Sequence, residues 1–361
     1  MTTKPHAPTK ATAVVLACLA AAAGLVPAAA DPPASTHAGY ERAAPALHGP
    51  PKLSLPVDCL PGETCFVQSH VDLDPGPGAR DYRCGSATYD GHKGVDFRLR
   101  SVAASRDGVA VLAAADGVVK RLRDGMEDAL VTKADRALVA RRGCGNSVLI
   151  EHGGGWQTVY CHMRNGSLVV RPGDVVRRGQ RIGDVGYSGL AEFAHLHLMV
   201  MHEGEVVDPV SGLHLGDACS AADESPPSGT LWDELAASAF AYRNGEFIGA
   251  GFSGRQVGTS ELELDHRVAS PDPASKAFLF YARLINLRAG DRVGLSVRGP
   301  SGFVVEHATA PLDRNKATYV AFAGRRLRAA RWPPGTYQGM ADLIRGGKTI
   351  ARSAPVRLTL P

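Results

Sequence analysis

Three short segments of this sequence carry histidine and aspartate side chains at spacings that suit metal chemistry. His92 and Asp96 lie four residues apart, in a stretch that enters a run of β-forming residues. Much further along the chain, one residue separates His195 from His197 within an apolar run, and His162 ends another β-type run. Imidazole and carboxylate groups are both common zinc ligands, so these segments together predict a metal site.

The alternation of side chains along a strand indicates which of these histidines act together. Successive residues of a strand point to opposite faces, so His195 and His197 point to the same face. Two imidazoles on one face of an apolar strand need partners, because burying unpaired polar groups is costly. A metal ion, or a catalytic pair of histidines beside one, would supply that need. His162 alone would be interpreted as structural, but the other two segments favour a catalytic role.

The elements that must position these residues are short strands. Glycine-broken β-type runs across residues 56–219 predict a compact all-β domain. Within it, residues 121–142 are interpreted as an insertion, either a surface excursion or the border of a groove. Residues 220–230 are rich in Ala, Ser, Pro and Asp and predict a linker. Residues 231–361 predict an accessory β-sandwich of the immunoglobulin-like kind.

Several stretches, taken in order, resemble the lysostaphin-type family of zinc metalloendopeptidases, which are peptidoglycan hydrolases. The resemblance covers residues 85–210, and the linker and the last domain lie outside it. It implies an antiparallel β-sheet peptidase domain. The stretches that carry it are 91–97, 113–119, 145–152, 160–163, 169–183, 186–189 and 195–197.

Carried over residue by residue, the resemblance implies a catalytic zinc site. His92, Asp96 and His197 would hold one Zn²⁺ per chain, with water in the fourth position. Zinc lowers the pKa of its water and polarises the scissile carbonyl. His162 and His195 would flank that water as the catalytic residues, one as general base and the other stabilising the oxyanion, without an assignment of which does which.

The resemblance also implies the substrate and the reaction. We expect hydrolysis of peptide cross-links between the peptide stems of bacterial peptidoglycan, at the D-alanyl to diaminopimelyl bond. A secreted protease that acts on other polypeptides is an alternative. So is a non-catalytic activator or wall-binding module on the same fold, although all five site positions are filled here.

This sequence departs from the family pattern at three places. Ala194 stands where proline is common, the insertion at 121–142 is long, and Cys161 adjoins His162. Cys144 and Cys161 lie at opposite ends of an expected hairpin, so we expect a cross-strand disulfide that braces the strand of His162. His152, in the turn of that hairpin, is interpreted as structural support.

The N-terminal residues predict export. Residues 1–30 begin with basic residues, continue with an apolar run and end with small residues, which is the order typical of a signal peptide. A lipid-attachment box at Cys18 is a competing interpretation, but the apolar run continues beyond it. Residues 31–55 form a proline-rich, flexible lead-in, and no later apolar run suits a membrane span. We therefore expect a periplasmic or extracellular, wall-associated protein.

Charge and cysteine content agree with that location. The formal charge of +4 falls to about +2 once Lys4 and Lys10 are removed, which gives no support for nucleic-acid binding. Six of the seven cysteines follow the expected signal peptide, and an even number in an exported protein favours disulfides. Up to three pairs are expected, among fifteen connectivities. Cysteine ligation of zinc is disfavoured, because no zinc-ribbon spacing occurs.

Overall fold

The computed structural model describes residues 49–132, 135–221, 227–265 and 268–361. The expected signal peptide and most of the lead-in lie outside these ranges. None of the helices within the ranges has the length and the apolar character that crossing a membrane requires. The described residues form mostly antiparallel strands, which confirms the all-β prediction.

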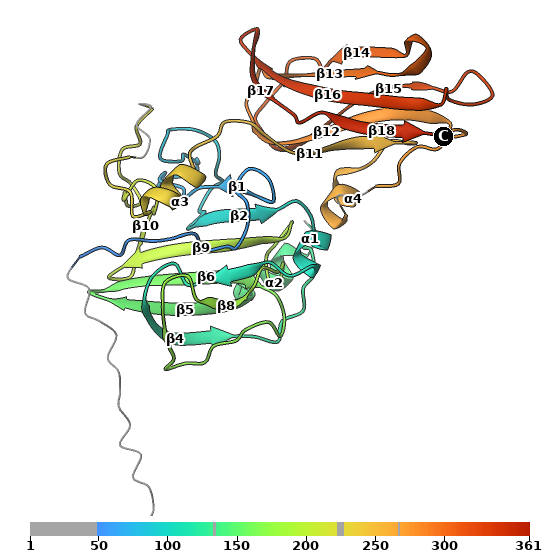
Figure 1. Ribbon diagram of the computed structural model, residues 1–361. Coiled ribbons are helices and arrows are strands. Elements are labelled where there is room, and N and C mark those ends of the chain that lie inside the picture. The colour runs from blue at the N-terminus through green and yellow to red at the C-terminus, as the bar shows by residue number, and fades with distance from the viewer. Residues whose placement is uncertain (1–48, 133–134, 222–226, 266–267) are drawn as a thin grey trace, which may run out of the picture. The chain divides into compact units, whose positions relative to one another are not determined.

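An eight-stranded antiparallel sheet forms the first part of the chain (Figure 1). Its strands run in the order β1-β2-β9-β6-β5-β4-β7, with β10 paired to β9. The central strands are buried along nearly their whole length, as in β2 and β6. The strands are β1 (Cys65–Ser69), β2 (Val95–Leu99), β4 (Gly117–Arg123), β5 (Asn146–Gly153), β6 (Trp156–Met163), β7 (Val175–Val176), β9 (His195–His202) and β10 (Glu205–Val207).

The expected hairpin joins β5 to β6. Gly153 pairs with Trp156, so Gly154 and Gly155 alone make the turn. Both have positive φ, 56° and 79°, which is the conformation of a type I′ turn and strongly favours glycine. Alternate residues of β5 are buried, as expected for a strand with one face on the core.

Smaller elements complete this first part. A separate two-stranded sheet pairs β3 (Ala110–Leu112) with β8 (Arg181–Asp184), and α1 (Val102–Arg106) follows β2. The insertion runs from the end of β4 through α2 (Arg136–Val139) and η1 (Ala140–Arg142). Its backbone joins the segment before β9 through a hydrogen bond from Val131 N to Ala191 O. The insertion therefore contacts the segment that leads to the paired histidines.

The core of the first part draws on residues from both flanks of the peptidase segment. Leu53, Trp232 and Phe240 are buried in the same apolar cluster as the strands. Leu53 forms a parallel bridge with Trp232, and α3 (Glu234–Ala239) buries Ala236 in this core. The domain limits remain our proposal, but residues 231–240, which we assigned to the accessory domain, pack with the first core.

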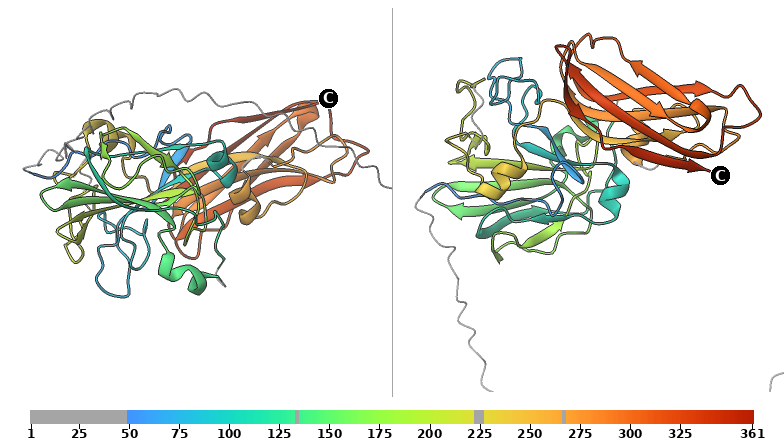
Figure 2. Two further views of the ribbon diagram at one scale, coloured as in Figure 1. Left: turned by 90° about the horizontal axis from the view of Figure 1, so that it is seen from below. Right: turned by 45° about the horizontal axis from the view of Figure 1, so that its top comes forward.

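Two further antiparallel sheets follow and share one apolar core (Figure 2). One has the order β11-β12-β15, and the other β14-β13-β16-β17 with β18 paired to β16. They make a β-sandwich, whose immunoglobulin-like kind remains a prediction. Its elements are β11 (Glu246–Ser253), α4 (Thr259–Leu264), β12 (Ala277–Leu287), β13 (Arg292–Arg298), η2 (Pro300–Gly302), β14 (Val304–Ala308), β15 (Lys316–Arg326), β16 (Gly335–Arg345), β17 (Lys348–Arg352) and β18 (Val356–Leu360).

The described cysteines form three disulfides, the number expected for an exported chain. Cys144 pairs with Cys161 across the β5–β6 hairpin, which confirms the predicted pairing. The other pairs join Cys59 to Cys65 and Cys84 to Cys219. The last of these ties the loop before β2 to the end of the peptidase segment.

Candidate active site

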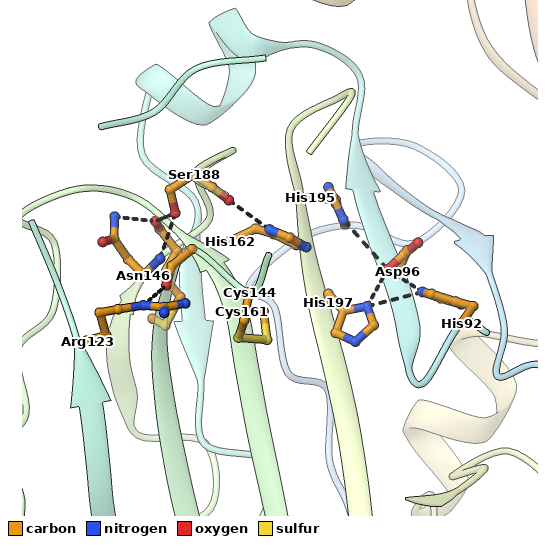
Figure 3. Close-up of a disulfide and its surroundings, with 12 residues drawn as sticks. His92, Asp96, Arg123, Cys144, Asn146, Cys161, His162, Ser188, His195 and His197 are labelled. Atoms are coloured by element: carbon orange, nitrogen blue, oxygen red, sulfur yellow. Dashed lines mark hydrogen bonds and ion pairs between the residues drawn. A yellow bond between two sulfur atoms is a disulfide. The ribbon is translucent and has the colours of Figure 1, made fainter. Parts of the chain in front are cut away.

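Neighbouring strands bring the predicted ligands together. Asp96 on β2 lies directly opposite His197 on β9, so their side chains share one face of the sheet. His92 lies in the turn before β2, four residues ahead of Asp96. In Figure 3 the rings of His92, His195 and His197 converge on the carboxylate of Asp96.

The three predicted ligands, which we call the metal cluster (His92, Asp96 and His197), have donor atoms at metal-binding separations. His92 Nε2 lies 3.0 Å from Asp96 Oδ1 and 3.1 Å from His197 Nδ1, and His197 Nδ1 lies 2.9 Å from that carboxylate oxygen. A tetrahedral ion with bonds of about 2.1 Å spaces its ligand atoms about 3.4 Å apart. The residues therefore fit a small divalent cation such as zinc.

Surrounding groups hold these ligands in place. His92 donates its Nδ1–H to the backbone carbonyl of His70 at 2.6 Å, which leaves Nε2 as the lone-pair atom of the neutral ring. At Gly94, a Cβ would lie 2.7 Å from Nε2 of His197 and 2.5 Å from the carbonyl oxygen of Leu198. Glycine is therefore required there for the ring of His197 to fit.

The charges of the metal cluster favour a cation. Burial would raise the pKa of Asp96, but His92 and His195 outweigh it and hold the pKa well below its usual range. Burial also acts to lower the pKa of His92, whereas the ionised Asp96 raises it overall. The carboxylate of Asp96 is thus ionised beside two imidazoles, and a metal ion would compete with protons for these atoms.

His162 and His195 lie beside the metal cluster with their rings 4.5 Å apart, centroid to centroid. His162 donates Nδ1–H to Ser188 O at 2.7 Å, and His195 donates Nδ1–H to Phe193 O at 2.9 Å. Each ring therefore keeps an unprotonated Nε2, and that of His195 lies 3.6 Å from Asp96 Oδ1. Burial lowers the pKa of both histidines, that of His162 well below its ordinary value. Both can accept a proton at neutral pH.

The backbone at His162 is strained in a way that aims its side chain. Its φ is +59°, in the left-handed region that residues other than glycine seldom adopt. Its N–H donates to Cys144 O at 2.8 Å, and the preceding residue, Cys161, is bonded to Cys144. The disulfide thus braces the strained position, as the sequence interpretation expected (Figure 3).

Three further residues differ in their relation to the site. The half-exposed ring of Tyr89 lies 4.5 Å from that of His92, and sequence reasoning missed it because no motif marks its position. His152 bonds Asp116 O and Thr158 Oγ1 and contacts none of the five site residues, which agrees with structural support. Ala194, in the place of the common proline, is fully buried and accepts a hydrogen bond from Leu99 N, so the ladder to β2 continues.

An antiparallel sheet with a His-Asp-His cluster and two flanking histidines defines a metallopeptidase-type domain. Residues 90–209 match the family model of Peptidase family M23, so this part of the chain is a Peptidase M23 domain. The resemblance to the lysostaphin-type family is thereby confirmed.

Two curated relatives and one solved structure are similar to this domain. The murein hydrolase activator NlpD of Escherichia coli is 32% identical over 124 residues, which are 34% of this chain and 26% of that protein. The DD-carboxypeptidase/endopeptidase Mpg of Neisseria meningitidis is 33% identical over 120 residues, 33% of this chain and 22% of that protein. The lysostaphin catalytic domain of Staphylococcus simulans is 24% identical with a TM-score of 0.26, covering 38% of this chain and 86% of that one.

This chain spans between 20% and 26% of the length of the curated relatives it matches. The likeness concerns the peptidase domain, and the sandwich lies outside the matched residues.

Proposed function

We propose that this protein is an exported zinc metalloendopeptidase that hydrolyses peptide cross-links of bacterial peptidoglycan. The observation that carries the proposal is the convergence of three metal-binding donor atoms with two neutral, buried histidines in one place. The Peptidase M23 domain supports the reaction class. The disulfides support export, because such bonds persist in oxidising compartments.

The residues divide the work of hydrolysis between them. His92, Asp96 and His197 would hold zinc, which supplies a Lewis acid for the scissile carbonyl and an acidified water. His162 or His195 would accept a proton at Nε2 from the attacking water, since each ring has its Nδ1–H engaged by a carbonyl. That histidine would then pass the proton to the leaving amine, while the other would stabilise the developing oxyanion.

We propose the D-alanyl to diaminopimelyl cross-link as the bond that is cut. Similarity to a DD-carboxypeptidase/endopeptidase supports a bond that follows a D-residue. A non-catalytic activator role is the second candidate, favoured by the similarity to murein hydrolase activator NlpD. The filled set of five site residues speaks for catalysis, because an activator has no need of a complete metal cluster.

The experiment is release of muropeptides from purified sacculi by the intact protein, measured by mass spectrometry. It is run with zinc, with a chelator, and with His197→Ala. The matched control is His202→Ala, because His202 lies at the far end of the same strand and stacks on Trp156. We expect zinc-dependent release that the chelator and His197→Ala abolish and that the control retains. The masses of the products identify the bond.

The opposite outcome is equally informative. In that outcome the folded, zinc-loaded protein releases no muropeptides from sacculi. If both it and His162→Ala then stimulate a second wall hydrolase, the protein is an activator and not an endopeptidase.

A further inference from the structure

Arg98 is a buried charge that the catalytic proposal does not use. It follows Asp96 by two residues on β2, so both side chains lie on one face, and it is fully buried. Its Nη2 donates to both carboxylate oxygens of Glu263, at 2.8 and 2.9 Å, and its Nη1 donates to Gln68 Oε1 at 2.5 Å. Arg283 on β12 also pairs with Glu263. We call Arg98, Glu263 and Arg283 the arginine cluster.

The arginine cluster joins two parts of the chain that are distant in sequence. Glu263 lies on α4 and is 165 residues beyond Arg98. Further contacts accompany the ion pairs: Asn286 Nδ2 donates to Gln68 O at 3.0 Å, and Phe66 packs with Ile248 and Ile285. The plane of the guanidinium is thus fixed by Glu263 of the sandwich together with Gln68 of β1.

The other side of Arg98 faces a residue that holds His195. The guanidinium carbon lies 4.4 Å from the ring centroid of Phe193, within the range of a cation–π contact. That ring contacts the His195 imidazole at a tilt of 37°, with the centroids 4.5 Å apart, and the Phe193 carbonyl accepts the Nδ1–H of His195. Phe193 therefore orients His195 both by its ring and by its backbone.

We propose that Arg98 is a positioning residue for His195, and that the sandwich, through Glu263, completes the active site. Arg98 lies opposite His195 where β2 pairs with β9, and its side chain donates hydrogen bonds to Gln68, Glu263 and a backbone carbonyl. It acts on the His195 ring through Phe193, whose ring it contacts. The kinetic consequence rests on the function proposed above, whereas the effect on the tautomer and orientation of His195 does not. The sandwich would then be required for catalysis even with no substrate contact of its own.

The variants follow from the charge balance of the cluster. Arg98→Met removes one of the two cations and leaves Glu263 paired with Arg283, so no buried carboxylate loses its counter-charge. Phe193→Leu removes the ring at a partly exposed position and keeps the carbonyl. Arg98→Lys restores a cation near the ring without the planar fork. The control, Asn286→Ala, removes the hydrogen bonds between β12 and β1 beside the cluster, including one from Gln68 Nε2. It leaves the ion pair of Arg98 with Glu263 and the ring of Phe193 in place.

The first readout is the imidazole nitrogen NMR spectrum of the zinc-loaded full chain, with His195 assigned from a His195→Gln spectrum. We expect one Nδ1–H tautomer for His195 in the parent and in Asn286→Ala. In Arg98→Met and Phe193→Leu the same signal should shift and broaden, while that of His162 stays in place. An unchanged His195 signal in both variants would overturn the proposal, whatever the activity of the parent.

The second readout is the kinetics of cross-link hydrolysis. We expect kcat to fall about ten-fold in Arg98→Met and in Phe193→Leu at nearly constant KM, with partial recovery in Arg98→Lys. The two losses should not add in the double variant, because both break one chain of contacts. Additive losses, or an equal loss of kcat in Asn286→Ala, would mean that Arg98 only stabilises the fold and would refute the inference.

Discussion

The metal cluster and the arginine cluster occupy neighbouring positions on β2, yet they differ in how their polar groups are satisfied. Around Asp96, lone-pair atoms of two imidazoles and a carboxylate crowd within 3.1 Å of one another. Around Arg98, guanidinium N–H groups meet the acceptors of Glu263 and Gln68. The first group of side chains needs a cation to complete it, whereas the guanidinium of Arg98 finds its acceptors within the protein.

This difference distinguishes a site that binds a metal ion from a set of ion pairs that holds two parts of the chain together. Both regions bury charge, and buried charge alone is weak evidence for either role. The balance of donors and acceptors decides between them, because acceptors that converge without donors are stable only around a cation. Substitutions in the metal cluster should therefore weaken metal binding, whereas substitutions in the arginine cluster should mainly lower stability.

Asp96→Asn should abolish tight zinc binding and hydrolysis together. We expect metal affinity to fall by more than about 100-fold, since losing a residue that merely orients a ligand already costs roughly 10–100-fold. Zinc should raise the unfolding free energy of the parent and leave that of the variant unchanged. The measurements are zinc titration by calorimetry and thermal unfolding with and without metal. Asp208→Asn, the same change at a buried acid outside the cluster, should bind zinc as the parent does; equal losses in both would contradict the comparison.

Glu263→Gln should destabilise the protein more than Arg98→Met. The first change leaves two buried arginines without a counter-charge, at a cost of about 3–5 kcal/mol, whereas the second leaves one balanced pair. Urea unfolding of the metal-free proteins measures both. If Arg98→Met proves the more damaging change, Glu263 is not the shared counter-charge of both arginines.

Gly94→Ala should weaken zinc binding without altering any charge. A Cβ there meets His197 Nε2 at 2.7 Å and the backbone of Leu198, so the ligand ring must move. We expect a loss of metal affinity of roughly ten-fold. Gly249→Ala is the matched control, because nothing lies within 4 Å of its Cβ position. Zinc titration of both variants tests whether the metal cluster depends on the placement of its atoms.

Asp208 should lower the stability of the fold as pH rises, whereas an ion-paired acid lowers it as pH falls. Burial raises its pKa from 3.8 to about 6, against hydrogen bonds from Ser211 and Val210 that lower it. Because the folded protein keeps a proton that the unfolded chain releases, this contribution is complete below the unfolded pKa and is lost as pH rises through 6.

The variant Asp208→Asn isolates that contribution. It should be more stable than the parent by about 1–3 kcal/mol near neutral pH, and the difference should vanish near pH 3.5. Urea unfolding of both proteins across this pH range measures the difference, in which the other titrating groups cancel. A constant difference at every pH would show that Asp208 keeps an ordinary pKa.

Local patterns in the sequence predicted much of what surrounds the candidate site. The glycines after His152 predicted the hairpin turn, and the positions of Cys144 and Cys161 on its two strands predicted their disulfide. The single-residue spacing of His195 and His197 placed both on one face of a strand. Each of these inferences depends on neighbours along the chain or on strand periodicity, which a sequence displays directly.

The parts that sequence reasoning missed depend on contacts between distant segments. Nothing in the residues around Arg98 indicates that Glu263 will pair with it, and the carbonyl of His70 has no side-chain signature. Trp232 followed a linker-like stretch and was assigned to the second domain, although it packs in the first core. Such contacts are decided by tertiary packing, which a single sequence shows only through residue type.

The packing of Trp232 against Leu53 also constrains the order in which the protein can assemble. A chain is synthesised from its N-terminus, so Leu53 and the ligand-bearing strands leave the ribosome before the residues that close their core. The first core is complete only when Phe240 has emerged, and the counter-charge of Arg98 arrives later still with Glu263. A nascent chain that already contains all five site residues therefore still lacks part of the core beneath them and the counter-charge of Arg98, and we expect the active site to be among the last features to mature.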